Sequence, residues 1–259
     1  MVLWTASVIP IATLACLAAS LSPKAAHEFR DYVRAAESRI QARYNGSSFL
    51  WAADQSDRMN RLRRGEILTE RVETPVIDGG LLHHWIGAVF IPGVTLQQVT
   101  SIDRSYSRHK ELYKPDVVES RTLSQDGNHY RIYMRLKKTH GPITAVLDTE
   151  HDVVYQSLDE KRMWSHSAST SVREVRDAGG SNERVLPPGE GFGFLWAIHS
   201  YWRLEQRDGG VYAECDAVSL SRALPLGMSK VFDPVIRTLS AGSLEKTLEA
   251  KRRAMLSGR

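Results

Sequence analysis

The fold of this 259-residue chain is decided by residues 193–222, which read GFLWAIHSYWRLEQRDGGVYAECDAVSLSR. The first part, residues 193–205, is rich in the aromatic and apolar side chains that favour a strand. Asp208, Gly209 and Gly210 then supply the residues of a tight turn, and residues 211–222 have the composition of a return strand. The stretch therefore predicts a long antiparallel hairpin.

A long helix is expected soon after this hairpin. Beyond Pro225 the apolar residues take up helical spacing, at Phe232, Ile236, Leu239, Leu244 and Leu248. A curved antiparallel sheet that is closed by such a helix encloses a hollow. Hollows of this kind commonly hold apolar ligands, so an internal cavity is the first functional expectation.

The rest of the chain supplies further strands, with helices near the ends. A helix is expected over residues 24–44, where apolar residues recur every three or four positions and Asn45-Gly46 gives the end. A second helix is expected over residues 96–113, because Thr95 and Gln98 form a capping-box pattern. Strand patterns occupy residues 65–73, 84–91, 117–123, 130–137, 143–155 and 162–175. Successive strands with segregated helices predict an α+β fold.

The N-terminal region predicts an exported protein. Residues 1–23 carry no charged side chain, which is typical of a signal peptide or a membrane anchor. Whether the segment is cleaved stays open, so the protein is expected to be periplasmic, secreted or membrane-anchored facing outward. Residues 24–60 are then an N-terminal helical arm, and residues 64–257 are the main domain.

Composition and charge restrict the partners. Hydrophobic residues make up 42% of the chain and charged residues 25%, as in ordinary globular proteins. The net charge of +4 gives a mild attraction to anionic surfaces, so a membrane surface is a candidate partner. Nucleic acid is not expected, because no dense basic stripe is interleaved with aromatics. The basic end of the chain, with Lys251, Arg252, Arg253 and Arg259, is interpreted as a solvated helix end.

Motifs for metal or hydrolytic chemistry are missing from the sequence. The nine histidines include no His-Glu-x-x-His motif, and the adjacent His83 and His84 would point to opposite faces of a strand. The chain has no Gly-x-Ser-x-Gly motif, and Cys215 is expected to be a small buried hydrophobe. The sequence therefore predicts no metal and no cofactor.

Several clusters resemble the START-like, or helix-grip, superfamily (SRPBCC), which includes lipid-transfer domains and polyketide cyclases. The similar segments are residues 169–175, 200–204, 209–212 and 219–222, followed by Pro225 before the closing helix. The resemblance covers roughly residues 64–256. It implies a curved antiparallel β-sheet wrapped around a long C-terminal α-helix, with an apolar cavity between them.

This resemblance directs attention to ten candidate ligand-binding residues. The apolar wall candidates are Trp85, Trp164, Trp196, Trp202, Phe232 and Ile236. The polar candidates are His166, His199, Tyr201 and Arg222. Each aromatic residue has core packing as its alternative role, and Arg222 could instead pair with a neighbouring carboxylate.

The function expected from these features is binding or transfer of a hydrophobic ligand, such as a lipid, without catalysis. One alternative is a cyclase- or aromatase-like enzyme, which would need His166, His199 or Tyr201 to converge as acid and base inside the cavity. Another is an envelope-associated structural or interaction module with a filled core. No residue is assigned as catalytic.

Overall fold

The computed structural model describes residues 20–46, 48–140, 143–223 and 229–257, with the backbone alone for residues 140, 143 and 229–241. The helical segments are α1 (Pro23–Tyr44), η2 (Trp51–Asp54), α2 (Ser56–Arg63), α3 (Leu96–Asp103), η3 (Tyr106–Arg108), α4 (His109–Leu112) and α5 (Ser229–Ser257). The strands are β1 (Ile67–Arg71), β2 (Gly80–Pro92), β3 (Val117–Asp126), β4 (His129–His140), β5 (Ile143–Ser157), β6 (Arg162–Arg176), β7 (Arg184–Val185), β8 (Ala197–Arg207) and β9 (Gly210–Arg222).

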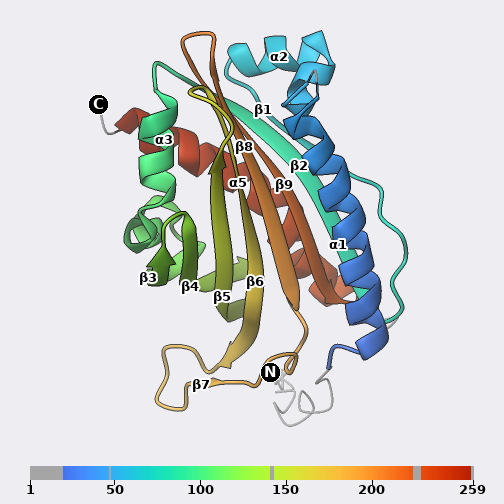
Figure 1. Cartoon of the computed structure of the whole chain (residues 1–259). Helices are drawn as coiled ribbons and strands as arrows, with labels where there is room; N and C mark the ends of the chain where they lie inside the picture. The colour runs from blue at the N-terminus through green and yellow to red at the C-terminus, as the bar shows by residue number, and fades with distance from the viewer. Residues whose placement is uncertain (1–19, 47, 141–142, 224–228, 258–259) are drawn as a thin grey trace, which may run out of the picture.

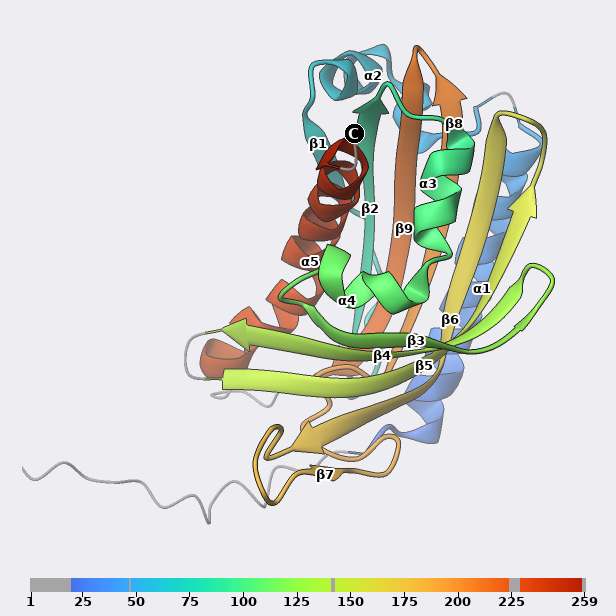
Figure 2. The same ribbon diagram turned by 90° about the vertical axis from the view of Figure 1, so that its left-hand side faces the viewer.

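Within the described residues, the strands form one open nine-stranded sheet in the order β1-β2-β9-β8-β6-β5-β4-β3, with β7 paired to β6. All the pairs are antiparallel. The hairpin predicted from residues 193–222 is β8–β9, in which Trp202 lies opposite Cys215. The strands form one sheet (Figure 1), which is strongly curved, so that β3, β4 and β5 cross the direction of β8 and β9 (Figure 2).

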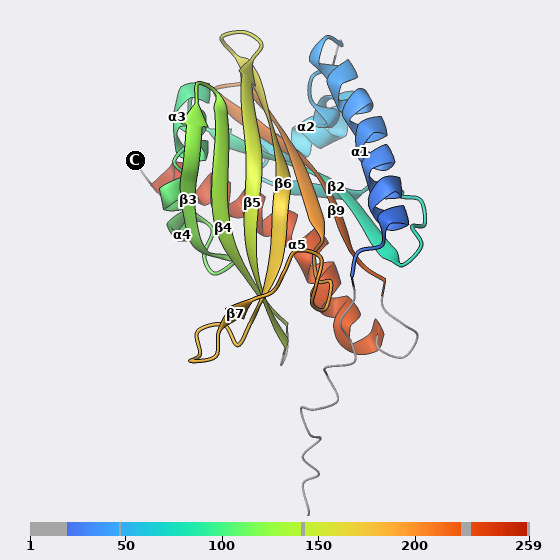
Figure 3. The same cartoon turned by 60° about the horizontal axis from the view of Figure 1, so that its bottom comes forward.

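The two faces of the sheet are covered by opposite ends of the chain (Figure 3). On the concave face, Ala213 and Cys215 of β9 join a buried cluster with Leu244 and Leu248 of α5. Gly87 of β2 permits this approach, because a Cβ atom there would lie 2.8 Å from Leu248 Cδ1 and 3.1 Å from Leu244 Cδ2. On the convex face, the apolar side of α1 packs on β2, β8 and β9 through a cluster that includes Phe29, Val33, Leu82, Tyr201, Val218 and Leu220.

A curved antiparallel sheet wrapped around a long C-terminal helix, with an N-terminal helix outside it, is the α+β helix-grip fold that the sequence predicts. The expected segment for export, residues 1–23, lies outside the described residues except for its last four. In the described part of the chain, no helix has both the length and the apolar character needed to cross a bilayer.

The single helix expected over residues 96–113 is wrong. Its start is confirmed, because Thr95 and Gln98 form the capping box at the N-terminus of α3. The helix ends at Asp103, however, and the backbone at Ser105 has the non-helical angles φ −84° and ψ 63°. This break turns Tyr106 inward, where its hydroxyl lies 2.6 Å from the Tyr155 hydroxyl.

The convex face contains a buried ionic centre on β8 and β9. The Arg203 side chain is 0% exposed, and it donates hydrogen bonds to Glu214 Oε1 at 2.8 Å and to Asp216 Oδ2 at 2.6 Å. Burial alone would raise the pKa of Asp216, but its hydrogen bond to His84 and the charge of Arg203 outweigh burial and lower the pKa. Asp216 is therefore held as a carboxylate inside the fold.

This ionic centre is bonded to the N-terminal arm. Glu214 accepts hydrogen bonds from the backbone amides of Trp51 at 2.9 Å and Ala52 at 3.0 Å, both in η2. Asp216 is 2.9 Å from His84 Nε2, and His84 Nδ1 is 2.7 Å from the Tyr32 hydroxyl of α1. The arm is thus attached to the sheet by polar contacts as well as by apolar packing.

We predict that Arg203→Met lowers the free energy of unfolding by about 3–5 kcal/mol, because it leaves two buried carboxylates without their cation. Urea denaturation measures the change. The matched control is Arg131→Met, whose side chain is 58% exposed and lies 3.4 Å from Glu150. The control should cost less than about 1 kcal/mol, and equal losses from the two variants would contradict the role of Arg203.

Candidate functional site

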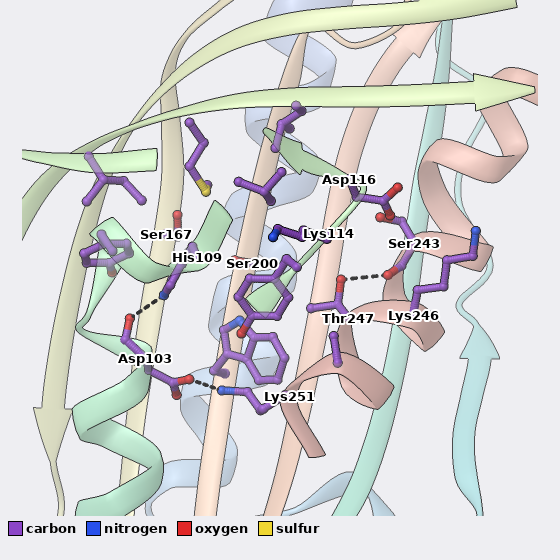
Figure 4. Close-up of a pocket in the computed structure, with 18 of the residues that line it drawn as sticks. Asp103, His109, Lys114, Asp116, Ser167, Ser200, Ser243, Lys246, Thr247 and Lys251 are labelled. Carbon is purple, nitrogen blue, oxygen red and sulfur yellow. Dashed lines mark hydrogen bonds and ion pairs between the residues drawn. The ribbon is translucent and has the colours of Figure 1, made fainter. Parts of the chain in front are cut away.

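A cavity of about 420 Å³ lies between the concave face, the α3–α4 segment and α5 (Figure 4). The sheet supplies an apolar wall, which consists of Val117, Ile132, Met134, Leu136, Val153 and Trp202. Three serines from β6 and β8 interrupt this wall, at Ser165, Ser167 and Ser200. Among the predicted wall residues whose side chains the structure describes, Trp202 is the one in the cavity lining.

One end of the cavity is built around Asp103, at the C-terminal end of α3. The Asp103 carboxylate forms an ion pair with Lys251 of α5, and the Asp103 carbonyl accepts a hydrogen bond from His109 Nε2 at 3.1 Å (Figure 4). The Lys251 ammonium also lies 4.3 Å from the centroid of the Trp202 ring. Burial lowers the pKa of His109, so its imidazole is neutral at neutral pH.

The position of Lys251 corrects the interpretation of the basic chain end as a solvated helix terminus. Lys251 is only 3% exposed, and its side chain faces the cavity instead of water. The reason is a long-range partner, because Asp103 supplies the countercharge that a buried ammonium requires. Arg253, by contrast, is exposed at the cavity edge, as the sequence interpretation expects of this segment.

The mouth of the cavity is basic. Lys114, Lys246 and Arg253 line it and are exposed, beside one exposed carboxylate, Glu249. Deeper in, the Lys138 ammonium pairs with Asp116 and donates to Ser243 Oγ at 3.0 Å. Burial lowers the pKa of Lys138, although Asp116 opposes that shift. The whole lining carries five cationic and three acidic side chains, which favours an anionic or polar group at the mouth.

A pair of neutral phenols completes the interior. Tyr106 and Tyr155 share a hydrogen bond of 2.6 Å, and the Tyr155 hydroxyl donates to the Asp103 carbonyl at 3.3 Å. Burial raises the pKa of both phenols, so both stay protonated. Because each of these hydroxyls already has a partner, this end of the cavity presents satisfied polar groups to a ligand.

Three of the remaining predicted wall residues lie outside the cavity lining. Trp85 is on the concave face, where it packs against the buried cluster beneath α5. Trp164 stacks on Tyr44 of α1, with ring centroids 5.0 Å apart and an angle of 11° between the planes. Trp196 packs against the α1 cluster on the convex face. Phe232 and Ile236 belong to α5, but their side chains lie outside the described part of the structure.

The three polar candidates of β6 and β8 converge, but beneath α1 and not in the cavity. The rings of His166 and Tyr201 stack with centroids 4.3 Å apart, and His166 Nε2 is 3.2 Å from His199 Nδ1. The Tyr201 hydroxyl donates to Glu37 Oε1 of α1 at 2.8 Å. Burial lowers the pKa of His166 and of His199 to about 4, so both imidazoles are neutral at neutral pH.

The last polar candidate, Arg222, ends β9. Its backbone amide donates to the Gly193 carbonyl at 2.8 Å, which joins the end of β9 to the segment that leads into β8. A ligand role for the Arg222 side chain stays a prediction. So do the ligand roles of the other nine candidates, including Trp202 in the cavity lining.

Sequence reasoning did not find the polar residues of the cavity. Asp103 and His109 flank the break in the expected helix, and no local pattern marks that break. Lys138 could have been found, because the alternation that places Ile132, Met134 and Leu136 on one face of β4 places Lys138 on the same face. A lysine on an apolar strand face requires a buried partner, here Asp116.

Comparisons with known proteins return solved structures only. No family model matches the chain, and no curated protein matches it. A STAR-related lipid transfer protein from Xanthomonas axonopodis is 16% identical, with 73% of this chain and 98% of that chain covered, at a TM-score of 0.47. The Zhui aromatase/cyclase from a Streptomyces species is 10% identical, with 68% of this chain and 94% of that chain covered, at a TM-score of 0.42. Human STARD10 is 8% identical, with 71% of this chain and 72% of that chain covered, at a TM-score of 0.42. The helix-grip fold follows from this chain's own strand order and closing helix.

We predict that His151, a buried histidine whose Nδ1 lies 3.3 Å from Oγ of the cavity-lining Ser167, makes stability depend on pH. Burial, with a smaller contribution from His199, lowers the pKa of His151 to about 4, against about 6.5 in an unfolded chain. The contribution of neutral His151 to the free energy of unfolding is therefore complete above about pH 6.5 and is lost as the pH falls towards 4. Replacing this residue, His151→Gln, should reduce the slope of unfolding free energy against pH by up to about 1.4 kcal/mol per pH unit.

Urea denaturation at several pH values in this window gives the two slopes. The control is His27→Gln, because the His27 side chain is 64% exposed on α1. The control should retain the wild-type slope. Parallel curves for His151→Gln and wild type would show that His151 does not titrate on unfolding.

Proposed function

We propose that the protein binds a hydrophobic small molecule in the cavity between the concave face and α5, with the polar or anionic end of the ligand at the basic mouth. The observation that supports this proposal is the combination of an apolar wall with an exposed cationic rim. Ile132, Met134 and Trp202 represent the wall, and Lys246 and Arg253 represent the rim.

The physical argument is the transfer of apolar surface out of water. Each Å² of apolar ligand surface that is buried against this wall contributes about 25 cal/mol to binding, before the entropy of association is subtracted. The charged groups deeper in the cavity reduce this binding free energy only slightly, because Lys251 is already paired with Asp103 and Lys138 with Asp116. An apolar tail therefore meets ion pairs that are already neutralised.

The dimensions of the cavity favour a compact ligand. A volume of about 420 Å³ lies within the range of about 300–1,000 Å³ that is typical of small-molecule sites. We infer a single-chain amphipath, such as a fatty acid, or a compact ring system, in preference to a two-chain phospholipid. A net charge of +4 and the basic mouth would favour loading of this ligand at an anionic membrane surface.

Binding without chemistry is preferred over a cyclase-like activity because of where the acid and base candidates lie. That alternative requires His166, His199 or Tyr201 to reach a ligand in the cavity. These side chains belong to the convex face, where His166 and Tyr201 contact Glu37 of α1. Export of the protein stays a prediction from residues 1–23.

We predict that Ser200→Phe, which places a ring inside the cavity, weakens oleate binding at least tenfold while the protein stays folded. Ser200 lines the cavity on β8, and a phenyl ring there would occupy part of the 420 Å³. Isothermal titration of delipidated protein with oleate, below its critical micelle concentration, gives the affinity. Dodecylamine should bind more weakly than oleate, because its cationic head meets the lysines of the mouth.

A matched pair of tryptophan variants separates stability from binding. Trp202→Ala removes a cavity wall and Trp164→Ala removes a convex-face contact, and each should cost about 3–5 kcal/mol if it acts as a packed core residue. Only Trp202→Ala should change the oleate affinity. Wild-type affinity in Ser200→Phe, or an equal loss in Trp164→Ala, would place the ligand outside the cavity.

A further inference from the structure

The convex face gathers three metal-binding side chains from distant parts of the chain. Glu37 comes from α1, His166 from β6 and His199 from β8. One ligand atom from each residue lies within 4.8 Å of the other two. His166 Nε2 is 3.2 Å from His199 Nδ1 and 3.7 Å from Glu37 Oε1. These atoms therefore surround a common point between the helix and the sheet.

The spacing fits a tetrahedral metal ion. Zinc binds imidazole nitrogen and carboxylate oxygen at about 2.0–2.2 Å, so two ligands of a tetrahedral ion are about 3.3–3.5 Å apart. The two distances from His166 Nε2 bracket this separation. Two imidazoles and one carboxylate are also a ligand set that suits Zn²⁺ better than Mg²⁺ or Ca²⁺, which prefer oxygen.

We propose that Glu37, His166 and His199 bind one Zn²⁺ ion between α1 and the convex face of the sheet. The fourth position is left to water, because the Tyr201 hydroxyl already donates to Glu37 Oε1. The ion would join α1 to β6 and β8, and it would thereby fix the N-terminal arm on the sheet. This proposal revises the expectation from sequence that the chain has no metal site.

The surroundings are already organised for such an ion. The Tyr201 hydroxyl donates to Glu37 Oε1 at 2.8 Å, and the stacked Tyr201 ring holds the His166 imidazole in place. Contacts of this outer kind orient metal ligands and strengthen binding. Both imidazoles are neutral at neutral pH, because burial lowers the pKa of each to about 4. Neutral imidazole is the form that binds metal.

An ion can reach this point from solvent. The His166 side chain is 23% exposed and the Glu37 side chain is 29% exposed, although His199 packs edge-on against Phe29. No short motif could reveal the site, because its three ligands come from α1, β6 and β8, which are far apart in sequence. The rival explanation is a chain of hydrogen bonds among Glu37, Tyr201, His199 and His166 that holds no ion.

Titration of chelator-treated protein with ZnCl₂ alone tests the proposal. Calorimetry should give one strong site per chain, and Zn²⁺ should raise the melting temperature of the wild-type protein. Co²⁺ in place of Zn²⁺ should give the visible absorption of a tetrahedral centre. Glu37→Gln, His166→Asn and His199→Asn should each weaken Zn²⁺ binding at least tenfold and remove the rise in melting temperature.

The matched control is His27→Gln. His27 and Asp31 lie one turn apart on the same helix with 3.3 Å between ligand atoms, and both are exposed, so they form the nearest rival pair on α1. The control should bind Zn²⁺ like wild type. If a histidine variant fails to fold, Glu37→Gln decides alone, because the Glu37 side chain is 29% exposed and the substitution keeps its size. Absence of Zn²⁺ binding by wild type, unchanged binding by Glu37→Gln, or loss of binding in His27→Gln would each overturn the proposal.

Discussion

The buried Arg203 guanidinium is the constraint on which the arrangement of this protein depends. It lies on a central strand with both faces covered, so water cannot solvate its charge, and Glu214 and Asp216 must hold it. Those carboxylates are in turn bonded to the η2 amides and to His84. The N-terminal arm is therefore bonded to the convex face, and the concave face is left to form a cavity with α5.

One strand consequently serves two different environments. Successive side chains of β8 point to opposite faces, so Ser200 and Trp202 line the cavity while His199 and Tyr201 lie beneath α1. The concave side combines an apolar wall with a basic mouth, as a carrier of an amphipathic molecule requires. The convex side combines imidazoles with a carboxylate, as a metal site requires. The two proposed sites are separated by the thickness of the sheet, so a change at one can leave the other intact.

The sequence predicts those parts of the fold that rest on strong local patterns. The β8–β9 hairpin, the capping box of α3 and the helix α1 are present, although β8 begins at Ala197 and not at Gly193. The end of α3 could not be predicted, because it depends on a distant contact between Tyr106 and Tyr155. For the same reason the sequence predicts a solvated Lys251, because its partner Asp103 is distant in sequence. The sequence also could not predict which face of β8 holds the cavity. Both faces are covered, so the alternation of side chains does not distinguish them.

The proposed function requires that an apolar ligand occupies the concave face beneath α5. Hydrogen–deuterium exchange with and without oleate tests this most directly, because it reports which amides the ligand protects. The account predicts slower exchange in α4 and in residues 243–257 of α5, with unchanged exchange in α1. Protection confined to α1, or bound oleate without any protection of α4 and α5, would contradict it.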